Sequence, residues 1–102
     1  MTNVANREEI LTYLSDSQDD LKRRYSLELI ALIGSLARND YRDDSDVDLI
    51  VRFLPETQHI HDLKQKLRSQ LEARFHRPVQ IASEKYLKPY YRSQILKDAV
   101  YV

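Results

Sequence analysis

Apolar residues recur at helical spacing near the amino terminus of this chain. The positions of this first pattern are Ile10, Leu14, Leu21 and Tyr25. Before them, Asn6 and Glu9 stand three residues apart, which is the signature of a capping box. These features predict a helix over residues 7–24, in which the poor helix formers of residues 15–17 could mark a break.

The rest of the pattern alternates between strands and helices. Residues 27–33 are apolar on both faces apart from Glu28, which is typical of a central strand covered on two sides. We expect further strands over 46–53, 79–82 and 100–102, and helices over 58–75 and 88–98, the last with Leu87, Tyr91 and Ile95 on its buried side. This order predicts an α/β (α+β) fold, with helices packed on one side of a small mixed sheet, in a single domain spanning 1–102.

The only glycine of the chain, Gly34, lies where the strand at 27–33 ends. Glycine is needed where φ is positive or where backbone approaches another group closely, so we expect a tight turn at this position. Ser35 follows, and residues 35–39 are expected to begin a helix. Its free N–H groups and the Ser35 hydroxyl, which also suits a helix N-cap, could hold a phosphate.

Two aspartates, Asp46 and Asp48, stand at the start of the strand at 46–53. Alternate residues of a strand share a face at a spacing of about 6 to 7 Å, so both carboxylates point away from the face that Val47 occupies. Neighbouring carboxylates in a water-poor cleft repel each other unless a hard cation such as Mg²⁺ lies between them. With the turn at Gly34, this arrangement predicts phosphoryl or nucleotidyl transfer.

The stretch GSLARNDYRDDSDVDLIV, residues 34–51, resembles the GSx10DxD signature of the DNA polymerase β-type nucleotidyltransferase superfamily. Within that superfamily the chain is similar, over nearly its whole length, to the minimal nucleotidyltransferases, the MNT or MntA-like antitoxins that are paired with HEPN toxins. The resemblance implies catalytic metal ligands and nucleotide-binding residues at matching positions. The implied ligands of Mg²⁺ are Asp46 and Asp48, and the implied ATP-binding residues are Gly34, Ser35, Arg38 and Ser45.

The same resemblance implies a function. It predicts an antitoxin that neutralises a HEPN ribonuclease toxin by Mg²⁺-dependent transfer of AMP from ATP onto a toxin tyrosine.

Two positions depart from the family pattern. Asn39 replaces a common glycine, which is a mild change because asparagine tolerates the left-handed region. Gln80 replaces the third carboxylate, so the alternative is a non-catalytic antitoxin that acts by binding and occlusion, with a weak or vestigial nucleotide site.

The amino-acid composition narrows the choice of cellular compartment and of ligand class. The chain has no cysteine, which excludes disulfides and thiolate metal sites, and it contains no long apolar run. We therefore expect a cytoplasmic protein that does not enter a membrane. The net charge of zero hides an asymmetry, since residues 1–59 hold 7 basic against 12 acidic side chains and residues 60–102 hold 9 against 4. The basic residues form no dense run, which argues against nucleic acid as a direct ligand.

Overall fold

The computed structural model describes residues 3–102 as four α-helices, four β-strands and one 3-10 turn. In chain order these are α1 (Arg7–Tyr25), β1 (Leu27–Ile33), α2 (Gly34–Arg38), β2 (Val47–Phe53), α3 (Ile60–Phe75), β3 (Val79–Ser83), the 3-10 turn η1 (Glu84–Tyr86), α4 (Pro89–Lys97) and β4 (Val100–Tyr101). Every helix and strand predicted from the apolar pattern is present, with ends that move by one or two residues. The turn η1 was not anticipated.

The four strands form one mixed sheet in the order β3-β2-β1-β4. β2 runs antiparallel to β1 and parallel to β3, and the short edge strand β4 pairs antiparallel with β1. Four of the seven residues of the central strand β1 are buried and only Glu28 is exposed, in agreement with its two-sided apolar pattern. The mixed sheet confirms the predicted fold class.

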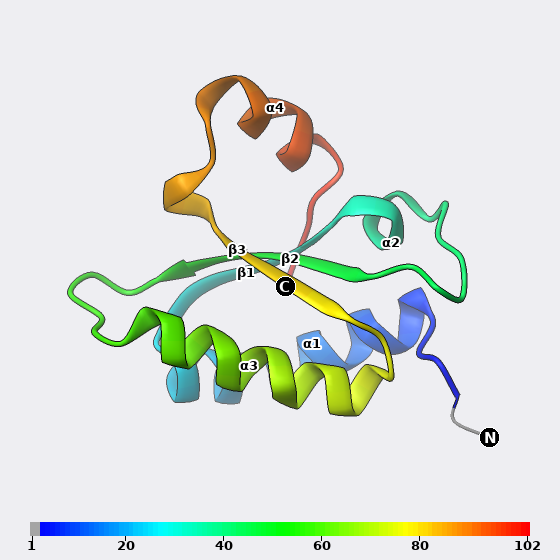
Figure 1. The fold of residues 1–102 in the computed structure, drawn as a ribbon, viewed down its shortest axis with the longest axis horizontal. Helices are drawn as coiled ribbons and strands as arrows, with labels where there is room; N and C mark the ends of the chain where they lie inside the picture. The colour runs from blue at the N-terminus through cyan, green and yellow to red at the C-terminus, as the bar shows by residue number, and fades with distance from the viewer. Residues whose placement is uncertain (1–2) are drawn as a thin grey trace.

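The two long helices, α1 and α3, cover one face of the sheet, whereas α2 and α4 stand on the other side (Figure 1). The core lies between the long helices and the sheet. Its fully buried members include Ile10, Leu14 and Leu21 of α1, Leu32 of β1, Leu49 of β2, and Leu67, Leu71 and Phe75 of α3. Burial of each of these side chains stabilises the fold by roughly 1.5 to 3 kcal/mol before chain entropy is counted.

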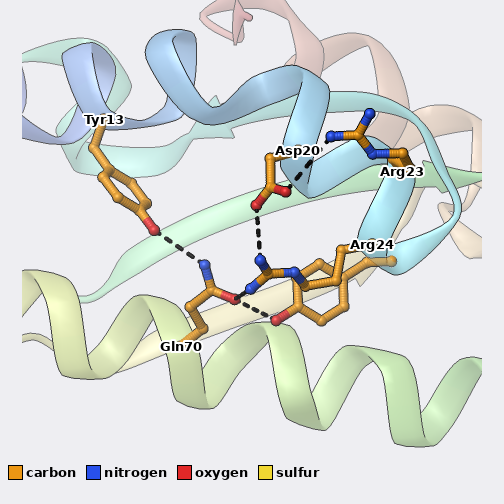
Figure 2. A network of polar contacts seen from close by, with 6 residues as sticks. Tyr13, Asp20, Arg23, Arg24 and Gln70 are labelled. Atoms are coloured by element: carbon orange, nitrogen blue, oxygen red, sulfur yellow. Dashed lines mark hydrogen bonds and ion pairs between the residues drawn. The ribbon is translucent and has the colours of Figure 1, made fainter.

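Polar contacts fix α1 against α3 at the rim of this core. The Gln70 amide donates to the Tyr13 hydroxyl at 3.0 Å, and its oxygen accepts from the Tyr25 hydroxyl (Figure 2). Arg24 adds a bond to the same oxygen at 3.3 Å. The Asn6–Glu9 capping box is present, and α1 continues through residues 15–17 without the break that their composition suggested, because its buried face is anchored on both sides of them.

The last helix, α4, differs from the others because none of its side chains is buried. Pro89 occupies its first turn, as the sequence predicts. The expected burial of Tyr91 is wrong, since this side chain is 47% exposed, and Ile95 is only half-buried. The reason is that α4 stands away from the sheet instead of packing onto it (Figure 1). Across residues 3–102, no helix has both the length and the apolar character to cross a membrane.

Candidate active site

Gly34 joins β1 to α2 at the point where β1 lies beside β2. Ile33 pairs with Asp48 in the β1–β2 ladder, so the residue after Ile33 passes directly beside the Asp48 side chain. Gly34 has a φ of +76°, and a Cβ added to it would lie 2.6 Å from Asp48 Oδ2. Both the backbone angle and the close approach disfavour any residue with a Cβ. The Gly-Ser turn and the second aspartate therefore form one compact unit.

The two aspartates lie at the same end of β2. Asp48 is the second residue of the strand, whereas Asp46 precedes the strand, so the predicted start of β2 at residue 46 is one residue too early. Both side chains are half-buried. Burial raises the pKa of Asp48, the negative charge of Asp46 raises that pKa further, and Arg38 lowers it. This pattern shows that Asp46 and Arg38 are close enough to Asp48 to act on its charge.

Ser35 and Arg38 both belong to α2. The helix begins at Gly34 with Ile33 at its N-cap position, where no side chain makes a cap hydrogen bond, so the expectation that Ser35 is an N-cap is wrong. Ser35 instead lies in the first turn and is half-buried. Arg38 forms an ion pair with Asp40 at 3.1 Å, and both partners are about half exposed. Exposed pairs of this kind stabilise a protein very little, so the guanidinium can turn toward another anion.

Ser45 lies in the turn that leads into Asp46. Its hydroxyl accepts a hydrogen bond from the Arg42 N–H at 2.8 Å, and its own N–H donates to the Arg42 carbonyl at 3.1 Å. These two bonds close the turn. Ser45 thus stabilises the turn that precedes Asp46. Its hydroxyl group retains capacity for a further hydrogen bond, which is compatible with contact to a nucleotide.

Arg77 holds this acidic loop in place, although nothing in the sequence beyond its position before β3 indicated this role. The side chain is 4% exposed. Its Nη1 atom donates to the carbonyls of Arg42, Asp43 and Ser45 at 2.9, 3.2 and 2.8 Å. Its Nε atom donates to the Ala5 carbonyl at 2.7 Å. One buried guanidinium therefore connects the loop before Asp46 to the amino-terminal segment.

Gln80 lies beside Asp48. The parallel register of β2 and β3 pairs these two residues directly, and partners in register share a face of the sheet. Gln80 is exposed. Within residues 3–102, no group of three or more His, Cys, Asp or Glu side chains is arranged to hold a metal ion. Gln80 therefore places a neutral amide, and no carboxylate, at the register partner of Asp48.

Glu84, another acidic residue of this region, is committed elsewhere. It is 7% exposed, forms an ion pair with Arg92, and lies 3.4 Å from Arg52. It follows Gln80 by four residues, which is about 13 Å along an extended chain. A groove of about 480 Å³ lies between the end of β2 and η1, near Glu84 and away from Asp48. Its lining includes none of the candidate site residues, which are Gly34, Ser35, Arg38, Ser45, Asp46, Asp48 and Gln80.

The sequence and the fold both match known proteins. A model of the nucleotidyltransferase domain matches residues 14–102. Protein adenylyltransferase MntA of Thermococcus cleftensis is 30% identical over 97 residues, which cover 93% of this chain and 94% of the relative.

Solved structures share the fold. The structure of a minimal nucleotidyltransferase superposes with a TM-score of 0.79 and 29% identity, over 97% of this chain and 98% of the other. A chain from the complex of a tri-AMPylated Shewanella oneidensis HEPN toxin with an MNT antitoxin has a TM-score of 0.60 and 17% identity, over 88% and 69% of the two chains.

Proposed function

Because the chain belongs to the nucleotidyltransferase domain family and is related to MntA protein adenylyltransferases, we propose that it transfers AMP from ATP onto a partner protein. We further propose that the acceptor is a HEPN-family ribonuclease toxin, modified on a tyrosine in the cytoplasm, and that the chain acts as its antitoxin in the form of a single domain. The observation that carries the proposal is the contact between Gly34 and Asp48, which joins the Gly-Ser turn to the aspartate pair.

The residues around Asp48 suit a Mg²⁺ ion. Two half-buried carboxylates, one of them with a raised pKa, supply hard oxygen ligands whose mutual repulsion a divalent cation would relieve. Asp46 and Asp48 would hold the ion, and the Gln80 amide oxygen is in register to take a third position. A Mg²⁺ ion held by these residues would supply positive charge that offsets the negative charge developing on the phosphates during transfer.

The residues of the Gly-Ser turn would bind the phosphates. No side chain caps α2, so the N–H groups of its first turn and the Ser35 hydroxyl are left to donate to phosphate oxygens. Arg38 is half exposed and pairs only with the exposed Asp40 among the described residues, so its guanidinium could add a positive charge. In the reaction, the acceptor hydroxyl oxygen forms a bond to the α-phosphorus, the bond from that phosphorus to the bridging oxygen breaks, and pyrophosphate leaves. The proton of the hydroxyl passes to water or to a basic group elsewhere on the acceptor protein, because the Gln80 amide cannot take it.

Gln80 also supports a second function. An antitoxin that binds its toxin and occludes it needs no general base, and a site with two carboxylates in place of three would hold nucleotide more weakly. In that case the toxin would be silenced by contact alone.

Co-expression with the HEPN-family partner separates the two functions. Intact mass spectrometry should show AMP increments on the toxin with the wild-type chain, and none with Asp46→Ala/Asp48→Ala. The exposed Asp43→Ala/Asp44→Ala pair is the matched control, because it removes two charges from the same loop without touching the aspartate pair. Toxin silenced by the Asp46/Asp48 variant without any mass change would reject transfer and leave occlusion.

Gln80→Asp tests the role of the amide. A carboxylate at this position would restore a metal ligand or a base, and such a group typically raises a rate by roughly two orders of magnitude. Single-turnover transfer of labelled AMP gives the measurement. An unchanged or lower rate would show that residue 80 does not act at the reacting centre.

A further inference from the structure

The helix α4 lacks the packing that normally stabilises a helix of its length. It has nine residues and no buried side chain. Helices this short are marginal in water unless an apolar face is covered. Among the described residues, the polar contact that ties α4 to the preceding chain is the ion pair between Arg92 and Glu84. A second surface that covers α4 would therefore complete its stabilisation.

Exposed tyrosines are concentrated beside and within this helix. Tyr86, Tyr90 and Tyr91 are 73%, 66% and 47% exposed, and the rings of the last two lie 4.2 Å apart. Lys85 and Lys88 are also exposed, and the Lys85 ammonium lies 5.7 Å from the Tyr86 ring. We call these five residues the tyrosine–lysine surface. Tyrosine is enriched in protein interfaces because it covers a large area at little conformational cost.

The charge of this surface selects its occupant. Within residues 3–102 neither Lys85 nor Lys88 makes an ion pair, while the one acidic residue of η1, Glu84, is buried and already paired. An acidic surface with apolar pockets for the tyrosines is therefore its complement. A symmetric second copy of this chain would place these lysines against themselves, which like-charge repulsion disfavours.

Single-stranded RNA also binds surfaces of aromatic and basic residues. Here the acidic loop argues against it. Residues 40–48 contain five aspartates against one arginine, and they connect α2 to β2. α2 and α4 stand on the same side of the sheet (Figure 1). An RNA strand lying along that side would meet repulsion from the loop, whereas a folded protein can present acidic residues to α4 alone.

We infer that the tyrosine–lysine surface is the docking surface for the acceptor protein, and that the acceptor offers an acidic patch to it. The inference rests on the proposed function for the identity of the acceptor, a HEPN-family protein. Docking here would bring the acceptor to the side of the sheet from which α2 rises after Gly34.

Isothermal titration with a HEPN-family partner protein, without nucleotide, tests the surface. Tyr90→Ser and Lys88→Glu should each weaken the complex tenfold or more, since central tyrosines and steering charges carry a large share of affinity. The matched controls are Tyr101→Ser and Lys66→Glu, which alter exposed residues on β4 and α3. They should leave the affinity within twofold. Equal affinity in the test and control variants would overturn the inference.

Hydrogen exchange on the unmodified proteins provides a second test that needs no variant. The amides of α4 should exchange at least tenfold more slowly in the complex than in the free chain, with no comparable change in α1. Unchanged exchange in α4 would overturn the inference. So would binding of a single-stranded RNA oligonucleotide, or self-association of the chain, that Tyr90→Ser abolishes.

The same experiments distinguish this inference from the proposed function. If the complex depends on Tyr90 but no AMP reaches the HEPN protein, transfer fails and the docking surface stands. If AMP is transferred while Tyr90→Ser and Lys88→Glu bind as well as wild type, the docking surface fails and transfer stands.

Discussion

Replacing Gly34 with alanine tests the geometry of the candidate site most directly. The new Cβ would lie 2.6 Å from Asp48 Oδ2 and 3.3 Å from Asp48 Cβ, where ordinary contact begins at 3.4 Å. The carboxylate oxygen must therefore retreat by about 0.8 Å, the difference between 3.4 and 2.6 Å. The backbone at φ +76° adds a separate penalty of about 1 to 2 kcal/mol for any residue with a Cβ.

The backbone penalty should reduce stability, and the displaced carboxylate should reduce the rate of transfer. The backbone penalty should lower the melting temperature by roughly 5 to 15 °C, because about 1 kcal/mol shifts a domain of this size by 4 to 8 °C. The displaced carboxylate should slow transfer of AMP by roughly a hundredfold, since a misplacement of about 1 Å in a catalytic group has an effect of that order. Stability and activity should thus fall together.

Asn39→Ala is the matched control. Asn39 ends α2 in the left-handed region with φ 66°, so alanine there is strained in the same way without touching Asp48. Thermal unfolding followed by circular dichroism and single-turnover transfer would be measured on both variants. Both should lose stability, and only Gly34→Ala should lose the rate. Equal rates in the two variants would refute the view that the Gly34–Asp48 contact positions a reacting group.

Two further predictions concern charge and loop support. Burial and the charge of Asp46 raise the pKa of Asp48 above its ordinary value of 3.8. Above pH 3.8 the folded state therefore keeps a proton that the unfolded state has released. The stability of the folded state declines as the pH rises from 3.8 through the folded pKa. In EDTA, Asp48→Asn should have a higher melting temperature than wild type at neutral pH. This difference should disappear by about pH 3, where Asp48 is protonated in both the folded and the unfolded state. The control Asp44→Asn should not show this pH-dependent difference in melting temperature. Arg77→Ala should lower the free energy of unfolding in urea by about 3 to 5 kcal/mol, because it removes four hydrogen bonds and leaves the buried Ala5 carbonyl unpaired, whereas the exposed Arg74→Ala should change it by less than about 1 kcal/mol.

The turn at the centre of the site could be predicted because its determinants are local. A lone glycine between an apolar strand and a serine indicates an unusual backbone angle, and Gly34 has one. Asn39 was expected to tolerate the left-handed region, and it adopts that region. The strands were predictable for a related reason, because the spacing of buried side chains is visible in the order of neighbouring apolar and polar residues.

The features that the sequence did not reveal depend on contacts between distant residues. Arg77 reads as an ordinary surface arginine, and only the folded chain brings to it the carbonyls of Ala5, Arg42, Asp43 and Ser45. Tyr91 has the spacing of a core residue in α4, but that spacing cannot say whether the helix reaches the sheet. The order of strands was likewise not fixed by local pattern, because pairing of β4 with β1 joins the end of the chain to its first strand.

Gln80 changes the electrostatics of the site even when no cation is bound. Asp48 already has a raised pKa from burial and from Asp46, and a carboxylate at its register partner would raise that pKa again. The neutral amide avoids this third charge, so the folded chain bears less repulsion in the absence of metal. The same substitution leaves fewer ligands to attract a cation. If the site binds Mg²⁺ as proposed, Gln80 stabilises the metal-free protein at the expense of metal affinity, and the choice between transfer and occlusion then depends on this one residue.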